Sequence, residues 1–192
     1  MTIELEGNWT KGRAYDVHTL SSTYLGPNEL GHDQYESIRS EMGELVYKLK
    51  YKQDKTVLPA IVTLLDKIKG IEQFDFIIPI PATKNYRSFK PVDEIAMALG
   101  GRRGVRVLTG YLVKSPGSFP LKNVKDAQER LKLLEASLSI EGKEPIEKRN
   151  VLLVDDLYRS GPTLLTATRL LLLTAKVAKV CVLTMTKTRS NR

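Results

Sequence analysis

Two strand–helix–strand patterns from residue 74 onward limit the folds that this chain can adopt. In the first, the apolar segments Phe74–Pro81 and Val105–Leu108 flank a helical pattern at Val92–Leu99. In the second, Val151–Val154 and Val177–Thr186 flank an apolar helix. Strands that alternate with helices pair in parallel and have both faces covered, so the pattern predicts an α/β fold with a mainly parallel sheet flanked by helices.

The N-terminal part of the chain predicts a small hood beside this sheet. Residues 1–32 are polar and rich in turn formers, so irregular structure or short strands packed on the larger unit are expected. Apolar residues keep helical spacing over Tyr35–Leu49 and over Val57–Ile68, which predicts two amphipathic helices, the second capped by Gly70.

The chain is expected to form one domain over residues 1–192, because no internal repeat, low-complexity tract or clear linker divides it. Within it, residues 1–70 supply the hood and its helices, and residues 71–192 supply the α/β core. Residues 110–149 form a long, charged connection with an expected helix at Asp126–Ala136. Connections of this length inside compact domains are usually functional lids or mobile excursions.

Composition narrows the partners without choosing one. The chain has 30 Lys and Arg residues against 22 Asp and Glu residues, a formal net charge of +8. This charge favours anionic partners, either nucleic acid or small phosphates. Cys181, the only cysteine, lies in an apolar run and is expected to be a buried structural thiol.

Targeting and membrane signals are not found in the sequence. The N-terminus, MTIELEGNWTKGR, lacks the basic and apolar regions of a signal peptide. The most apolar segment, LLTATRLLLLTA, is interrupted by Arg169 and is shorter than the roughly 20 residues of a membrane-spanning helix. A cytoplasmic protein with no membrane partner is therefore expected.

The stretch VLLVDDLYRSGPTL, residues 151–164, carries the most specific chemistry. Open parallel sheets bind ligands beyond the carboxyl ends of their strands. Here a buried strand ends at Asp155 and Asp156, which can accept hydrogen bonds from hydroxyl groups or face a divalent metal. A helix expected from Pro162 to Ala175 follows, and its N-terminus favours a phosphate. Two acids and a phosphate site that lie a few residues apart in the sequence suit a ribose 5-phosphate.

A purely structural interpretation explains part of the same stretch. Ser160 can cap the helix, Pro162 can occupy its first turn, and acidic residues near a helix N-terminus are favourable. Capping does not account for two acids at the end of a buried strand, so we favour a binding site.

The stretch resembles the phosphoribosyl pyrophosphate (PRPP) motif of type I phosphoribosyltransferases, in which four apolar residues, two acids and three variable residues precede a Ser/Thr-Gly-x-Thr turn. The resemblance implies catalytic roles for Asp155 and Asp156 at the ribose hydroxyls, with Mg²⁺ bound to them through the substrate. It also implies that the turn binds the 5-phosphate through Arg159, Ser160, Gly161, Pro162 and Thr163.

Further segments resemble the ComF-like branch of this family. They are LKYK at Leu49–Lys52, the strand, loop and helix at Ile77–Gly100, and the segment Gln128–Ile140. Together they extend the similarity to about residues 45–188. Many members carry an N-terminal zinc-binding knuckle, which a chain with one cysteine cannot supply.

The resemblance implies two more groups of ligand contacts. One is a pyrophosphate-binding turn at Ala82, Thr83 and Lys84. The other is a flexible loop over residues 110–130, from which Lys114, Lys122 and Arg130 could contact pyrophosphate. For the loop residues, an ordinary solvated surface remains an equal alternative.

Two residues of the motif depart from the family pattern. Arg159 stands where purine-salvage members carry an aspartate, and Pro162, which has no backbone N–H, replaces a small residue. The expected function is transfer of a phosphoribosyl group from PRPP to an unidentified nitrogen acceptor. The alternative is a non-catalytic PRPP sensor or a ComF-like accessory protein in DNA uptake or another nucleic-acid process. Whether the chain forms a homodimer is left open.

Overall fold

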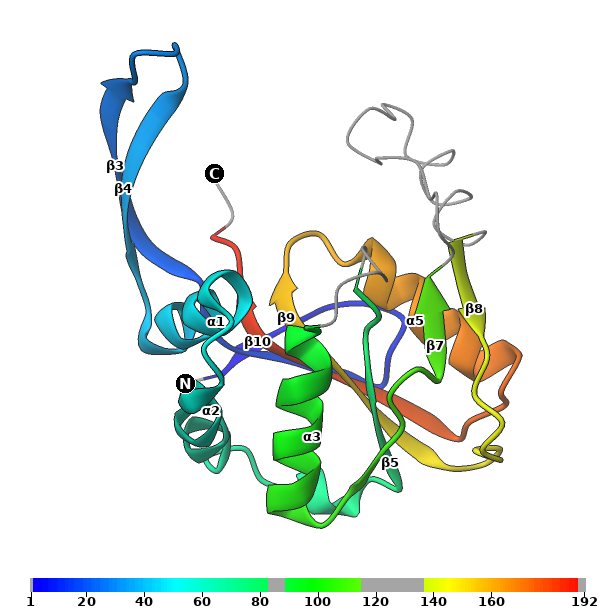
Figure 1. Cartoon of the computed structure of the whole chain (residues 1–192). Coiled ribbons are helices and arrows are strands. Elements are labelled where there is room, and N and C mark those ends of the chain that lie inside the picture. Colours follow the sequence, from blue (N-terminus) through cyan, green and yellow to red (C-terminus); the bar gives the residue numbers. More distant parts are fainter. Residues whose placement is uncertain (1, 83–88, 115–136, 190–192) are drawn as a thin grey trace.

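The computed structural model of the chain describes residues 2–82, 89–114 and 137–189 (Figure 1). A six-stranded sheet forms its centre, in the order β1-β2-β10-β9-β5-β6. Every neighbouring pair is parallel except β1 with β2. The strands are β1 (Ile3–Glu4), β2 (Lys11–Val17), β5 (Phe76–Pro79), β6 (Arg106–Val107), β9 (Asn150–Tyr158) and β10 (Lys179–Lys187). The predicted mainly parallel sheet is confirmed.

Helices cover both faces of this sheet, as predicted. One face carries α1 (Glu41–Lys52), α2 (Leu58–Leu65) and α3 (Pro91–Arg103), and the other carries α5 (Pro162–Leu173). Two short 3-10 helices are η1 (Lys55–Val57) and η2 (Ile71–Gln73). A separate two-stranded antiparallel sheet, β7 (Leu112–Lys114) with β8 (Leu138–Ile140), lies beside α5. In the described part of the chain, no helix is long and apolar enough to cross a membrane.

Strand β9 divides the hydrophobic core into two. Leu152 and Val154 point to the face covered by α1, α2 and α3, whereas Val151 and Leu153 point to the face covered by α5. All four side chains are at most 4% exposed. Because a strand covered on both faces has no solvated side, its sequence is a continuous apolar run rather than an alternating one.

A hairpin stands apart from both layers. It consists of β3 (Thr19–Pro27) and β4 (Asp33–Arg39), which pair only with each other in the described residues. Figure 1 shows it rising from the end of the sheet near α1 and extending away from the rest of the molecule. The hairpin is the N-terminal element that best fits the expected hood.

The N-terminal predictions require two corrections. Residues 1–32 are more regular than expected, since β2 enters the central sheet beside β10 and β3 forms half of the hairpin. The helix predicted from Tyr35 begins only at Glu41, after Ser40, whose hydroxyl accepts a hydrogen bond from the Gly43 amide. Tyr35 belongs to β4 instead, where it pairs with Tyr24 of β3. Helix α2 also ends at Leu65, and Gly70 precedes η2.

The end of β9 also differs from the sequence-based prediction. Strand β9 does not stop at Val154 but continues to Tyr158, because β10 pairs with it along this whole length, from Lys179 opposite Asn150 to Lys187 opposite Tyr158. Asp155 and Asp156 therefore lie inside a strand. The helix predicted at Asp126–Ala136 falls outside the described residues.

Helix α1 is held close to the sheet by a glycine. A Cβ atom at Gly43 would lie 2.2 Å from the His18 carbonyl oxygen, which follows β2. We expect Gly43→Ala to lower the free energy of unfolding by about 1–3 kcal/mol, because the backbone must move to admit the methyl group. Chemical denaturation monitored by circular dichroism measures this change.

Gly101 provides the matched control for this prediction. It is also helical, in α3, but a Cβ atom there meets nothing within 4 Å. Gly101→Ala should raise stability by up to about 1 kcal/mol, because alanine has the higher helix propensity. Equal effects of the two substitutions would contradict the proposed close contact of α1.

Candidate functional site

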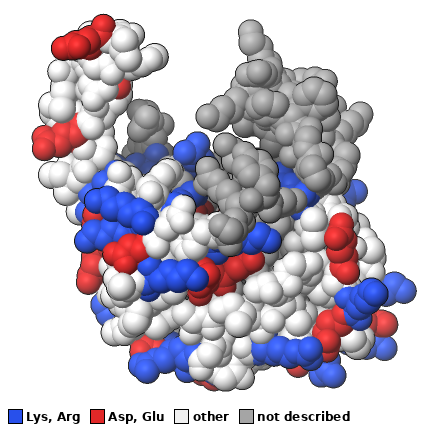
Figure 2. Space-filling view, viewed as in Figure 1, with Lys and Arg blue, Asp and Glu red and all other residues white. Residues whose placement is uncertain are grey.

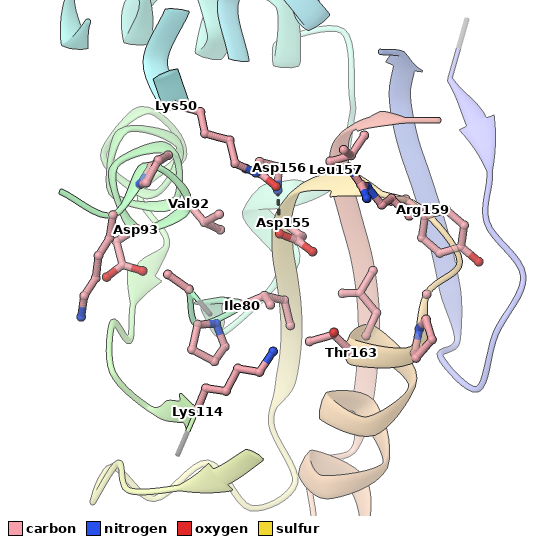
Figure 3. Close-up of a pocket in the computed structure, with 18 of the residues that line it drawn as sticks. Lys50, Ile80, Val92, Asp93, Lys114, Asp155, Asp156, Leu157, Arg159 and Thr163 are labelled. Atoms are coloured by element: carbon pink, nitrogen blue, oxygen red, sulfur yellow. Dashed lines mark hydrogen bonds and ion pairs between the residues drawn. The ribbon is translucent and has the colours of Figure 1, made fainter. Parts of the chain in front are cut away.

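A cavity of about 480 Å³ opens at the carboxyl edge of the central sheet. Its walls come from the ends of β5 and β9, the first turns of α3 and α5, the end of α1, and β7. Figure 3 shows that charged side chains from several of these elements converge on it. Residues distant in the sequence, such as Lys50, Lys114 and Asp155, meet here. The expected site at the strand ends therefore coincides with a real cavity.

The two acids of β9 line this cavity in different ways. Successive strand residues point in opposite directions, and Figure 3 shows Asp156 turned toward Lys50 while Asp155 points into the cavity. Asp156 is 6% exposed, and its Oδ2 atom lies 2.5 Å from Lys50 Nζ. Asp155 Oδ1 accepts a hydrogen bond of 2.8 Å from the Asp156 backbone N–H. The acids therefore form two distinct contact points.

Lys50 is a site residue that the sequence analysis did not assign. It lies in the last turn of α1, and 106 positions separate it from its partner Asp156. The LKYK segment resembles the ComF-like branch, but the sequence predicts no role for its lysine. No spacing rule connects α1 to β9, so only the folded chain reveals this ion pair.

Asp155 is electrostatically unusual. Its burial and the neighbouring Asp156 carboxylate raise its pKa to about 8, although the Asp156 backbone N–H, Lys50 and Lys114 oppose this rise. Desolvation disfavours the charged carboxylate, and a like charge disfavours it further. In the unliganded protein, burial and the like charge of Asp156 therefore favour the protonated form of Asp155. Perturbed carboxyl groups of this kind cluster in functional clefts.

The turn before α5 forms the opposite end of the cavity. Gly161 is the N-cap residue with φ of 80°, a conformation that glycine adopts at little cost, and α5 has no side-chain cap. Ser160 therefore does not cap the helix, contrary to the structural interpretation. Pro162 occupies the first helical position, as that interpretation expected. The first backbone N–H groups of an uncapped helix can bind an anion.

The remaining predicted residues are only partly visible. Ala82 lines the cavity, whereas Thr83, Lys84, Lys122 and Arg130 lie outside the described residues. Lys114 also lines the cavity, but it projects from strand β7 and is 6% exposed. Burial lowers the pKa of Lys114, and the nearby Asp155 partly opposes this effect. The lysine expected on a flexible loop is therefore a buried residue of a strand.

Comparisons with known proteins give limited similarity. No family model matches the chain, and no curated protein matches its sequence. Adenine phosphoribosyltransferase from Thermoanaerobacter pseudethanolicus is 16% identical, with a TM-score of 0.46 over 86% of this chain and 94% of that one. A second adenine phosphoribosyltransferase is 13% identical, with a TM-score of 0.45 over 88% and 86% of the two chains.

A hypoxanthine phosphoribosyltransferase from Staphylococcus aureus is 16% identical, with a TM-score of 0.40 over 72% of this chain and 64% of that one. Identities this low leave the chemistry of the cavity to be inferred from the residues that line it.

The raised pKa of Asp155 predicts a stabilising substitution. The folded chain retains a proton that the unfolded chain loses near pH 4, so the stability of the wild type should fall as the pH rises from about 4 to 8. Asparagine keeps the acceptor oxygen but cannot ionise. Asp155→Asn should therefore raise the free energy of unfolding by about 1–3 kcal/mol at pH 8, and by progressively less toward pH 4.

Thermal or urea unfolding across this pH range measures the difference. Asp16→Asn is the matched control, because Asp16 accepts the same kind of bond, 2.8 Å from the Val17 backbone N–H, outside the cavity. If Asp155→Asn and Asp16→Asn change stability alike at every pH, the electrostatic account of Asp155 is wrong.

Proposed function

We propose that this chain is a phosphoribosyltransferase that binds PRPP with Mg²⁺ and transfers its phosphoribosyl group to a nitrogen acceptor, releasing pyrophosphate. The observation that carries the proposal is one cavity with the acids of β9 at one point and the uncapped N-terminus of α5 at another. Carboxylates accept hydrogen bonds from the ribose hydroxyls, and the helix N-terminus binds the 5-phosphate.

The charges around the cavity support a polyanionic ligand. Lys50, Lys90, Lys114 and Arg159 line it together with Asp93 and the two acids of β9. A volume of about 480 Å³ lies within the range of small-molecule sites. Basic side chains offset the charge of the phosphate and the pyrophosphate. The acids bind the hydroxyl groups of the ribose that lies between these two charged groups. This division of roles matches the parts of PRPP.

The acids also fit a magnesium ion that arrives with the substrate. Among the described residues, no group of three or more His, Cys, Asp or Glu side chains forms a metal cage. Mg²⁺ commonly uses one or two carboxylates together with water and substrate phosphates, and Asp155 and Asp156 supply such carboxylates. When bound, the ion would neutralise charge that develops on the departing pyrophosphate.

The protein's contribution to the reaction is positioning. The acceptor nitrogen donates an electron pair to C1 of the ribose, and the C1–O bond breaks with its electrons leaving on pyrophosphate. Asp155 and Asp156 would orient the ribose by its hydroxyls, and the turn at Arg159–Thr163 would fix the 5-phosphate. Lys114, buried in the opposite wall, would stabilise negative charge more strongly than an exposed lysine.

Membership of the ComF-like branch is part of this proposal. Its support is Lys50, the lysine of the LKYK segment, which reaches Asp156 of the PRPP-like motif. A shared contact between two segments that both resemble the branch gives the resemblance a physical basis. The choice of nitrogen acceptor would then depend on residues that differ from those of purine-salvage enzymes. Arg159 is one such residue.

One observation favours a second candidate, binding without turnover. Pro162 occupies the first position of α5 and cannot donate a backbone hydrogen bond to the 5-phosphate. A site with one donor fewer could serve as a sensor of PRPP. Measuring pyrophosphate release with a panel of nitrogen acceptors separates the two, because a sensor binds PRPP and releases none.

Calorimetric titration tests the binding step that both candidates share. Wild-type protein should bind PRPP in the presence of Mg²⁺, and the double variant Asp155→Asn/Asp156→Asn should bind it at least about tenfold more weakly, because the charge of Asp156 and the ability of Asp155 to ionise when Mg²⁺ binds are both lost. Asp16→Asn should bind like the wild type. No binding by wild type, or equal binding by the double variant, would refute the site.

The turn before α5 can be tested separately through Gly161. A Cβ atom there would lie 2.8 Å from the Tyr158 ring, in a backbone conformation that disfavours alanine. Gly161→Ala should therefore displace the turn and weaken binding of PRPP and ribose 5-phosphate by about tenfold. Titration of both ligands measures the loss.

Gly110→Ala is the control for backbone strain alone. Gly110 has a similar φ of 72°, but its Cβ position is open and it does not line the cavity. Its substitution should leave both affinities unchanged. If Gly161→Ala also leaves ribose 5-phosphate binding unchanged, the turn does not hold the phosphate.

A nucleic-acid role, the remaining alternative, has a distinct signature. Neutralisation of several DNA phosphates would make affinity fall steeply as salt concentration rises. DNA binding measured at several salt concentrations detects this dependence. If the protein does not bind DNA, or binds it independently of salt, the net charge of +8 would instead serve to attract small phosphates.

A further inference from the structure

The β3–β4 hairpin exposes an unusual amount of apolar surface. Of the nine large hydrophobic side chains that are exposed in the described residues, six lie in it or in its turn: Leu20, Tyr24, Leu25, Leu30, Tyr35 and Ile38, each 52–80% exposed. Isolated two-stranded hairpins are marginally stable in water. Tyr24 and Tyr35 pair across the two strands, so these two form a continuous apolar patch, and such a patch on a projecting element indicates an interaction site.

The two edges of this hairpin differ sharply in charge. Strand β3, TLSSTYLGP, contains no charged residue along nine positions, and its outer edge has no strand partner in the described residues. Strand β4, DQYESIR, carries Asp33, Glu36 and Arg39. Exposed edge strands are normally protected by charges against pairing with another chain. In this hairpin only β4 carries charges; β3 has register irregularities between Thr19 and Ser21 and between Tyr24 and Gly26, so its regular uncharged stretch is Ser21–Tyr24.

Charge also varies along the length of the hairpin. Glu29 and Asp33 lie at its tip, whereas Arg39, which also contacts Glu44 at 3.5 Å, lies at its base, and Arg189 donates a hydrogen bond to the Leu20 carbonyl there. Figure 2 shows acidic residues on the projecting hairpin and basic residues near its base. An antiparallel partner strand would bring the tip of one hairpin beside the base of the other.

We propose that β3 pairs antiparallel with β3 of a second copy of this chain, giving a four-stranded sheet in the order β4-β3-β3-β4 about a two-fold axis. The uncharged edges meet at the centre, and the charged β4 strands lie outside, where they oppose further addition. In the antiparallel orientation, the acidic tip of each hairpin lies beside the positively charged base of the other hairpin, and this attraction favours it. A two-fold contact is self-complementary, so the assembly closes at two copies.

The pairing also gives the exposed tyrosines a common surface. Tyr24 and Tyr35 face each other across the hairpin, with ring centroids 5.3 Å apart. A two-fold axis perpendicular to the sheet keeps both pairs on the same face. Sheets of three or more strands with an apolar face reach the stability that a lone hairpin lacks. The proposal is independent of the activity assigned to the cavity.

Thr23 is the position that tests this contact. It lies at the centre of β3, so the two-fold axis would place Thr23 opposite Thr23 of the second copy. Within its own hairpin, Thr23 faces Glu36. Thr23→Lys therefore creates like charges across the dimer axis and an opposite-charge pair inside the hairpin, so the hairpin itself should remain folded.

Light scattering after size exclusion, over a range of protein concentrations, provides the measurement. The wild type should approach twice the chain mass of 21.6 kDa, and Thr23→Lys should raise the dimer dissociation constant on the order of tenfold or more. Glu36→Gln is the matched control, since it changes the charge by the same amount at the facing position of β4. This control should remain dimeric.

Cross-linking supplies a second, independent readout. Cys181, the only native cysteine, is buried. Thr23→Cys should therefore form a disulfide-linked dimer under mild oxidation, whereas Glu36→Cys should not, because β4 lies on the outside of the proposed sheet. A wild type that stays monomeric at every concentration would overturn the proposal. So would a dimer that neither Thr23→Lys weakens nor Thr23→Cys captures.

Discussion

The pairing of β9 with β10 along its full length is the constraint on which the candidate site depends. Because the ladder continues to Tyr158, Asp155 and Asp156 are held in extended backbone and point in opposite directions. One acid meets Lys50 and the other faces the cavity. Had the strand ended at Val154, both acids would have lain on a turn, where neither direction is fixed.

Several features of the site lower the stability of the fold, and a purely structural protein would avoid them. A carboxyl group with a raised pKa, a buried lysine, an uncapped helix and a left-handed glycine all converge on one cavity. The raised pKa, the buried lysine and the uncapped helix are each unfavourable alone, the left-handed turn requires glycine, and two buried hydrophobic clusters lie beneath them. Departures from local rules are expected where a protein binds or reacts. Their convergence supports a functional cavity more strongly than any one residue does.

The hairpin departs from these rules in a different way, at the surface rather than in the core. Its strands satisfy each other but leave apolar side chains and one uncharged edge exposed. It begins directly after β2, at the same edge of the sheet as the cavity. An assembly through β3 would use no residue that lines the cavity.

The sequence alone determined the fold class and the local character of the site. The run VLLV predicts a strand buried on both faces, and Pro162 indicates the first turn of a helix, because these signals act over a few residues. Only the tertiary structure decided that Lys50 pairs with Asp156, that Lys114 is buried in a strand, and that β2 joins the central sheet. Such contacts depend on how distant segments pack, and no local pattern of residues encodes them.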